Sequence, residues 1–349
     1  MELRNRGINW SRRVARGERW APSVRASRAA ALVIAVAAAA WLAGLGVPLL
    51  GPAVFALVLG IVVRTTVPAA ADTSADAGRL GTRVLQLTIV LLGLSVNVVD
   101  VLAVARDSLP VMLGTLATGL VFIWLVGGRL GVAAPIRALI AVGTSICGAS
   151  AIAAVAPAVS ASAAEISYAI SVIFLYNIVA VVAFPVVGHA LGFSVQSFGL
   201  WAGTAVNDTS SVLAAGFAFG AGAATIAAVV KLSRTLMILP VTLLVAIAAG
   251  RGADAPARGR IGQTVARALP WFMVAFLVAT TVNALGFVPS GAVAGVGSLA
   301  SVCTVIALSA IGLGTDLRLV RRTGPRPLLL GLLGWLAVAG TSLLLQAAT

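Results

Sequence analysis

Residues 143–157 read Gly143-Thr-Ser-Ile-Cys-Gly-Ala-Ser-Ala-Ile-Ala-Ala-Val-Ala-Pro157 and lie inside a long apolar run. In lipid every backbone N–H and C=O needs an internal partner, so a broken helix at membrane depth persists only where protein or a wet cavity surrounds it. Transporters use such interrupted helices to present backbone groups to a substrate. Close packing of small residues between helices produces a similar composition. The stretch therefore indicates either a substrate site or a tight helix contact.

The composition excludes an ordinary soluble domain. Apolar residues make up 60% of the chain and charged residues 10%, with a mean hydropathy of +1.08, whereas about a quarter of a soluble domain is charged. We predict an all-α polytopic membrane protein with interrupted helices at the midplane, a basic cytosolic tail (1–28) and one integral membrane domain (29–349). About eleven transmembrane helices are expected at 29–47, 49–66, 84–104, 109–128, 134–159, 166–187, 195–218, 223–248, 266–286, 291–314 and 327–346.

The basic residues indicate how the chain is oriented. If residues 1–28 are cytosolic, all of the 24 basic residues except Arg106, Lys231 and Arg234 fall on the cytosolic side. This bias follows the positive-inside rule. The net charge of +14 is therefore attributed to membrane topology and not to nucleic-acid binding. We predict a multi-pass protein of the cell membrane, with its N-terminus in the cytoplasm and its C-terminus outside.

The same bias bears on the seventh apolar run, 195–218, which is polar from Asn207 to Ser211. If this run entered the membrane and returned, every later basic gap would change sides. We therefore predict a full crossing with an irregular middle. The fifth and seventh runs would then be parallel.

A weak internal repeat is present. The pattern Gly93-Leu-Ser-Val-Asn97 followed by Pro110 resembles Gly312-Leu-Gly-Thr-Asp316 followed by Pro327. Seven predicted crossings separate the two copies, and seven is an odd number. The copies would therefore run in opposite directions, as in the inverted repeats of many secondary transporters.

Two basic residues fall within the eighth run. A charge at the bilayer centre costs about 3 kcal/mol on insertion scales, so such residues face the protein interior and are candidates for function. Lys231 and Arg234 are three residues apart and share one helix face. They are expected either to attract an anionic substrate through charge-assisted hydrogen bonds or to neutralise a buried acid.

Two acidic residues have alternative interpretations as well. Asp208 would carry a coupling proton, or it would cap a helix, because Asp bonds readily to nearby backbone groups. Glu165 begins the sixth run, where it would take part in coupling or stabilise a helix start. Asn177 is expected to act as a polar contact between helices.

Four segments carry a family resemblance. They are Gly143-Thr-Ser-Ile-Cys-Gly-Ala-Ser-Ala-Ile with Pro157, Gly203-Thr-Ala-Val-Asn-Asp, Ala214-Ala-Gly216 and Val230-Lys-Leu-Ser-Arg-Thr-Leu. Together they resemble the bacterial YeiH-type family, whose members are labelled sulfate exporters, from about residue 30 to the C-terminus. The resemblance implies the fold of cation/proton antiporters and bile-acid symporters, with inverted repeats and crossed, unwound helices. Members often carry a histidine before the acid, where this chain has Asn207-Asp208, so a proton role for that histidine does not transfer.

The predicted function is a secondary transporter that exports a small anion of sulfate or organosulfur type, coupled to a proton or sodium ion. The alternatives are a sodium/proton antiporter and a membrane scaffold or sensor that transports nothing. We expect no enzyme activity, cofactor, bound metal or nucleic acid; a homodimer is compatible with the sequence. The predicted substrate-binding residues are Gly143, Thr144, Ser145, Cys147, Gly148, Ser150, Thr204, Asn207, Thr209, Ser210, Lys231 and Arg234, and the predicted coupling residues are Asp208 and Glu165.

Overall fold

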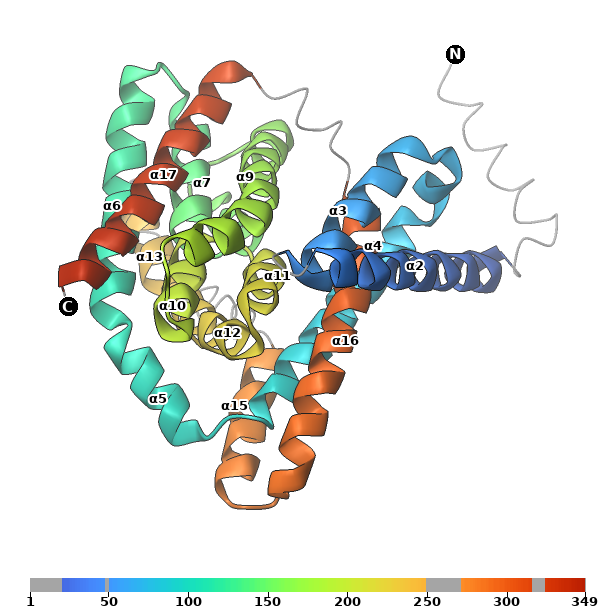
Figure 1. Ribbon diagram of the computed structural model, residues 1–349. Coiled ribbons are helices and arrows are strands. Elements are labelled where there is room, and N and C mark those ends of the chain that lie inside the picture. Colours follow the sequence, from blue (N-terminus) through green and yellow to red (C-terminus); the bar gives the residue numbers. More distant parts are fainter. Residues whose placement is uncertain (1–20, 48–49, 249–270, 316–323, 349) are drawn as a thin grey trace, which may run out of the picture.

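The computed structural model describes residues 21–47, 50–248, 271–315 and 324–348, and all of their regular secondary structure is helical (Figure 1). The predicted all-α class is confirmed. Most of the predicted tail and two of the predicted basic gaps lie outside the described residues. The helices are α2 (Ala21–Gly46), α3 (Gly51–Thr66), α4 (Pro68–Gly93), α5 (Val98–Asp107), α6 (Leu109–Arg129), α7 (Ala134–Ser145), α8 (Ala149–Val155), α9 (Ala163–Ala190), α10 (Val195–Ala205), α11 (Thr209–Phe219), α12 (Ala221–Thr235), α13 (Ile238–Ala248), α15 (Trp271–Ala284), α16 (Ser290–Gly314) and α17 (Pro325–Ala348).

Several helices are long and apolar enough to cross a membrane. Six of the described helices or joined helices meet this test, and a seventh is added if α4 and α5, which meet at a bend of 104°, count as one span. The predicted number of eleven crossings is not confirmed. Four apolar helices are shorter than a full crossing: α3, α7, α11 and α15.

Helices α2, α3, α4, α15 and α16 form one bundle, called the α4 bundle below (Figure 1). Gly314 lies against Gly78, and Gly81 lies against Ala310, so α4 and α16 run antiparallel. Close approach requires glycine here. A side chain at Gly60 on α3 would meet the carbonyl oxygen of Ser309 at 2.6 Å.

The second bundle contains α6 to α13 and α17 and is called the α9 bundle (Figure 1). Gly119 lies against Val338, and Gly334 lies against Ile123, so α6 and α17 are also antiparallel. The pairs α4–α16 and α6–α17 contain the two copies of the predicted inverted repeat. Their antiparallel packing is what such a repeat requires.

Helices α10 and α11 form a hairpin, and the predicted full crossing of run 195–218 is wrong. A straight helix would hold Phe198 and Phe219 about 30 Å apart, yet their rings stack with centroids 3.9 Å apart. Both rings also lie against Gly188, near the C-terminal end of α9. The hairpin tip, by contrast, bonds to Asn177 in the middle of α9. The run therefore enters beside one end of α9 and returns to the same end.

Helices α7 and α8 form a second hairpin, which enters from the opposite end of α9. A side chain at Gly143 would meet Ile152 at 2.9 Å, although nine residues of straight helix span about 13 Å. Val159, which follows α8, lines the same pocket as Ala134 at the start of α7. The fifth run also returns to the end from which it started.

The two hairpins explain why the charge bias could not detect them. One re-entrant hairpin moves every later gap to the opposite side, and a second hairpin moves the later gaps back. Only α9 between them changes direction, and its flanking loops contain no lysine or arginine. The units α7–α9 and α10–α13 each consist of a hairpin followed by a long helical segment, and they enter from opposite ends. The fifth and seventh runs are thus an inverted pair and not parallel crossings.

Candidate functional site

The first hairpin turns at Ile146–Gly148, between α7 and α8. Gly148 has φ +70° and ψ −125°, a conformation that glycine adopts without the strain a Cβ would cause. Its N–H donates to the carbonyl oxygen of Gly143 at 2.9 Å, which closes the C-terminal end of α7. This break exposes the carbonyl groups of the last turn of α7 to side-chain partners.

The second hairpin turns at Val206–Asp208, between α10 and α11. Asp208 is the N-cap of α11, and its carboxylate accepts from the backbone N–H groups of Ser210 at 2.8 Å and Ser211 at 3.2 Å. The hydroxyl groups of both serines also donate to this carboxylate. The N–H of Asn207 donates to Oδ1 of Asn177 on α9 at 2.9 Å. The polar run therefore forms a capped turn tied to α9.

The two hairpin tips meet beside the middle of α9. A Cβ on Gly148 would lie 3.8 Å from the carbonyl oxygen of Asn207 and 3.8 Å from Cβ of Asp208, and 3.4 Å from Ile173 of α9. Ile173 and Asn177 are one helical turn apart. The tips Ile146–Gly148 and Val206–Asp208, with the adjoining part of α12, are called the crossing below.

Helix α12 brings two cations to the crossing. Nζ of Lys231 donates to the carbonyl oxygen of Ile146 at 3.1 Å, and Nε of Arg234 donates to the carbonyl oxygen of Ser145 at 2.5 Å. Both side chains are 0% exposed. Positive charge stabilises a helix C-terminus, so these bonds cap the broken end of α7. Among the described residues, neither cation forms an ion pair with a carboxylate.

The crossing contains unsatisfied polar groups. Seven buried side-chain atoms of the crossing and of the adjoining residues of α7 and α9 have no hydrogen-bond partner within the described part of the chain. A buried polar group without a partner costs about 1–3 kcal/mol, so a concentration of them indicates that a ligand or water is expected. The atoms are Nη1 and Nη2 of Arg234, Oγ1 of Thr144, Oγ of Ser145, Nδ2 of Asn177, and Oδ1 and Nδ2 of Asn207.

Some predicted site residues are near the crossing but are already occupied. Cys147 lies in the tip and is a free, buried thiol. Thr204 bonds to Ser342 of α17 at 2.8 Å and to its own helix, which makes it a contact between helices. Thr209 is the first residue of α11, after the cap, and is partly buried. Ser210 is held by Asp208.

Two further predicted site residues have other surroundings. Ser150 is exposed on α8, and its side chain hydrogen-bonds to the thiol of Cys147. Glu165 lies at the first turn of α9, about two helical turns from Ile173. Its carboxylate accepts from the N–H of Ser162 at 2.7 Å and from the hydroxyl of Ser162 at 2.8 Å, completing a capping box. The structure gives Glu165 the role of a helix cap and does not bring it to the crossing.

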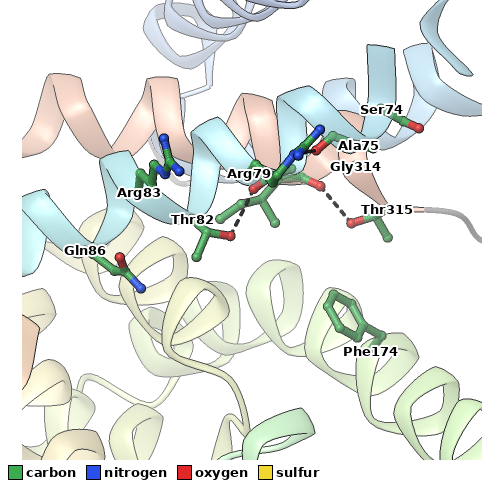
Figure 2. Close-up of a pocket in the computed structure, with 11 residues that line it drawn as sticks. Ser74, Ala75, Arg79, Thr82, Arg83, Gln86, Phe174, Gly314 and Thr315 are labelled. Atoms are coloured by element: carbon green, nitrogen blue, oxygen red, sulfur yellow. Dashed lines mark hydrogen bonds between the residues drawn. The ribbon is translucent and has the colours of Figure 1, made fainter. Parts of the chain in front are cut away.

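A cleft that apolar length and charge bias do not predict lies between the two bundles (Figure 2). It has a volume of about 610 Å³ and lies between α4, the C-terminal end of α16, and Phe174 of α9. Arg79 and Arg83 fall in the gap between the predicted runs 49–66 and 84–104, but they are on α4 and line this cleft. Their spacing of four residues in one helical segment was the available signal.

Comparisons with known proteins identify the family. The model of the family described as conserved hypothetical protein 698 matches residues 29–331. A UPF0324 membrane protein of Streptococcus agalactiae is 36% identical over 323 residues, covering 90% of this chain and 95% of the relative. One from Fusobacterium nucleatum is 34% identical over 331 residues, covering 90% and 96%.

Another relative, from Clostridium tetani, is 34% identical over 308 residues, covering 85% of this chain and 89% of the relative. No solved structure matches the chain. The relatives are named as membrane proteins, in agreement with the apolar helices of this chain. The chain therefore belongs to the conserved hypothetical protein 698 family of UPF0324 membrane proteins, the YeiH-type family that its motifs resemble.

Proposed function

We propose that this protein is a secondary transporter that exports a small anion across the cell membrane. The observation that carries the proposal is the environment of Arg234. Its guanidinium is buried where two hairpins from opposite ends of the bundle meet, and its Nη1 and Nη2 have no partner among the described residues. Half-helices that meet inside a membrane domain are the arrangement in which secondary transporters hold their substrates.

The charge balance at the crossing favours an anion. Removing a cation from water costs several kcal/mol unless an opposite charge and hydrogen bonds compensate. Lys231 and Arg234 are two buried cations, and Asp208 is the acidic residue that interacts electrostatically with Lys231. Asp208 already accepts from four donors of Ser210 and Ser211. An oxyanion would take the unused guanidinium donors through charge-assisted bonds.

The alternatives receive less support. A sodium site needs several oxygen ligands that are free to bind, whereas the carboxylate of Asp208 is occupied and Lys231 and Arg234 would repel a cation. In a scaffold without a ligand, water alone would have to satisfy these buried groups. The family resemblance makes sulfate and organosulfur anions the first substrates to test. Coupling to a proton or sodium ion remains part of the proposal.

Orientation and alternating access follow from the two bundles. We place the N-terminus in the cytoplasm, because two opposed hairpins leave the basic gaps on one side. Movement of the α9 bundle against the α4 bundle would expose the crossing to one side and then to the other. The bundles meet through the small residues Ala214 and Ala218 of α11, which pack against α3 and α16.

The test is anion flux in proteoliposomes with the double variant K231Q/R234Q. Sulfate, sulfite, thiosulfate and taurine are supplied in turn, first in a thermal-shift screen, since a ligand stabilises the folded form, and then in flux. We expect the double variant to lose flux. R129Q, which changes an exposed arginine at the end of α6, should retain it. Undiminished flux in a K231Q/R234Q protein that elutes normally on size exclusion would refute the proposal.

A further inference from the structure

Helix α4 carries a polar stripe along one face. The stripe consists of Arg79, Thr82, Arg83 and Gln86, which follow the spacing of one helix face. All four line the cleft between the bundles. Other residues of α4 are buried in apolar clusters with α2, α15 and α16, and in its C-terminal half also with α11 and α12. In Figure 2, Thr82 and Gln86 extend on the side of α4 nearer Phe174, whereas the guanidinium groups of Arg79 and Arg83 point away from Phe174.

The stripe cannot face lipid along its length. Arginine side chains within a membrane-crossing helix are rare and face a bundle interior or a water-filled cavity. The side chain of Arg79 is 72% exposed, and Thr82 and Arg83 are also exposed. Exposure without lipid contact requires water. A cleft of about 610 Å³ has room for a hydrated small ion.

The cleft leads toward the crossing. Phe174 lies across the cleft from the stripe, and it follows Ile173 in α9. Ile173 lies against both Gly143 in α7 and Gly148 in the tip of the first hairpin. The path from the arginines of α4 to the hairpin tip is therefore interrupted by the side chains of this one turn of α9.

We propose that the α4 stripe forms a hydrated, anion-selective access path from the cytoplasm to the crossing. The proposal rests on the proposed transport function and adds a route and its selectivity to it. The cleft is also lined by Gly314 and Thr315, the last residue and the C-cap of α16. Clefts lined by one sign of charge raise the local concentration of the opposite ion and its rate of entry.

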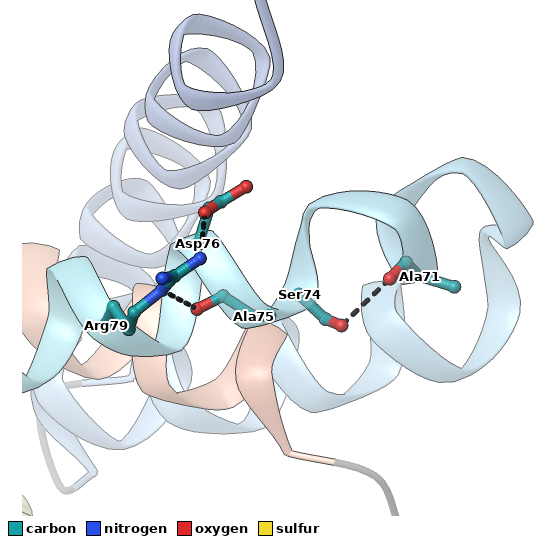
Figure 3. A network of polar contacts seen from close by, with 5 residues as sticks. All are labelled: Ala71, Ser74, Ala75, Asp76 and Arg79. Atoms are coloured by element: carbon teal, nitrogen blue, oxygen red, sulfur yellow. Dashed lines mark hydrogen bonds and ion pairs between the residues drawn. The ribbon is translucent and has the colours of Figure 1, made fainter. Parts of the chain in front are cut away.

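Asp76 moderates this attraction. Its Oδ1 lies 2.6 Å from Nη2 of Arg79, and Nε of Arg79 donates to the carbonyl oxygen of Ala75 (Figure 3). One of the two arginines is thus partly neutralised, whereas no ion pair to a described carboxylate is found for Arg83. Loss of Asp76 and loss of the arginines should therefore change anion entry in opposite directions.

Thiol labelling tests the cleft without requiring transport. Thr82→Cys is introduced into a C147A/C303A background, and its reaction with a sulfonate-bearing methanethiosulfonate is compared with that of a trimethylammonium analogue. The ratio of rates is normalised to Arg129→Cys on α6. We expect a ratio several-fold in favour of the anionic reagent, which falls toward one when R79Q/R83Q is added. Val121→Cys, on the exposed apolar side of α6, should react with neither.

Two labelling results would overturn the proposal. No reaction of Thr82→Cys with either reagent would mean a dry cleft, and preference for the cationic reagent would mean the wrong selectivity. Both are judged in protein that elutes normally on size exclusion.

Flux measurements then separate the access path from the crossing. In proteoliposomes we expect R79Q/R83Q to raise the KM for sulfate several-fold with little change in maximal rate, D76N to lower that KM, and R129Q to leave it unchanged. An unchanged KM in R79Q/R83Q overturns the access path even if the wild type transports sulfate. If the wild type carries no tested anion, the transport function fails, and the labelling ratio alone decides whether the cleft is an anion path.

Discussion

The crossing and the cleft each contain a pair of cations on one helix face, in opposite environments. Lys231 and Arg234 are fully buried and bond to backbone carbonyl groups. Arg79 and Arg83 are exposed to the cleft, and Arg79 is paired with Asp76. Water screens the second pair but not the first.

This difference suggests two roles: the buried pair recognises the bound anion, and the exposed pair attracts anions into the cleft. A buried guanidinium acts through the direction of its donors, because each unsatisfied N–H in a dry site must find an acceptor. An exposed guanidinium acts mainly through its charge, because water satisfies its donors. The shape of the side chain should therefore matter at Arg234, and its charge alone should matter at Arg79 and Arg83.

Lysine in place of arginine gives the largest expected effect at the crossing. In R234K the ammonium can still donate to the carbonyl oxygen of Ser145, but the two unpartnered nitrogens are lost. At about 1.5–3 kcal/mol for a hydrogen bond to a charged group, sulfate affinity should fall about 10- to 100-fold. R79K keeps its charge in water and should change affinity less than about twofold. Equilibrium binding to purified protein measures both.

If R234K and R79K changed sulfate affinity equally, the buried and the exposed arginines would not differ in how they act. If R234K bound sulfate normally while K231Q/R234Q lost stability, the cations would serve only to cap α7. A thermal-unfolding control on each variant separates these outcomes.

Alanine in place of glycine compares the backbones of the two regions. In G148A a Cβ is placed at φ +70° and ψ −125° in the hairpin tip, a conformation that L side chains rarely adopt, which should lower the free energy of unfolding by about 1–3 kcal/mol. In G78A the new Cβ lies 3.7 Å from Gly314 of α16, an ordinary contact between the two helices, and alanine favours a helix over glycine, so stability should stay equal or rise by about 0.5–1 kcal/mol. Denaturant unfolding in detergent measures both. A stable G148A would mean that the tip adopts another conformation.

Apolar length and charge bias predicted the class of fold and the approximate position of the polar breaks, but not the hairpins. A run of about 25 apolar residues fits one crossing or two half-length helices equally well. Contacts such as Phe198 with Phe219 distinguish them, and these are not visible in a window of sequence. The effects of two opposed hairpins on the positive-inside count also cancel. The direction of α9 therefore cannot be read from the positions of the arginines.

The candidate site was predicted in part for a related reason. Lys231, Arg234 and Asn207 were detectable because a polar residue in an apolar run is costly. Glu165 satisfied the same rule, but its partner Ser162 makes it a cap. Hydropathy places Arg79 and Arg83 in a gap between helices because the first half of α4 is polar on average. Only the helical spacing of its polar residues distinguishes a solvent-exposed face from a buried one.

Replacing Asn177 with aspartate tests whether an anion binds at the crossing by electrostatic attraction. N177D keeps an acceptor for the N–H of Asn207 but replaces the unpartnered amide nitrogen with a negative oxygen. Repulsion between this oxygen and a bound anion should weaken sulfate binding about fivefold to tenfold, or about 1–1.4 kcal/mol. Isothermal titration of the purified variant measures the change. Unchanged binding would place the anion away from α9.

Replacing Glu165 with glutamine should have the smallest effect on anion flux. This variant tests whether transport needs a charged group besides the two cation pairs. Gln is also found at this position of a capping box, so E165Q should keep the cap with Ser162 and lose no more than about 0.5 kcal/mol of stability. S162A removes the cap and should cost about 1 kcal/mol. Because Glu165 lies at the end of α9, away from both the crossing and the cleft, E165Q should leave the pH dependence of anion flux unchanged. If E165Q shifted the pH dependence of anion flux while stability was unchanged, Glu165 would be a coupling acid at the end of α9. The buried and exposed cation pairs would then not account for transport by themselves.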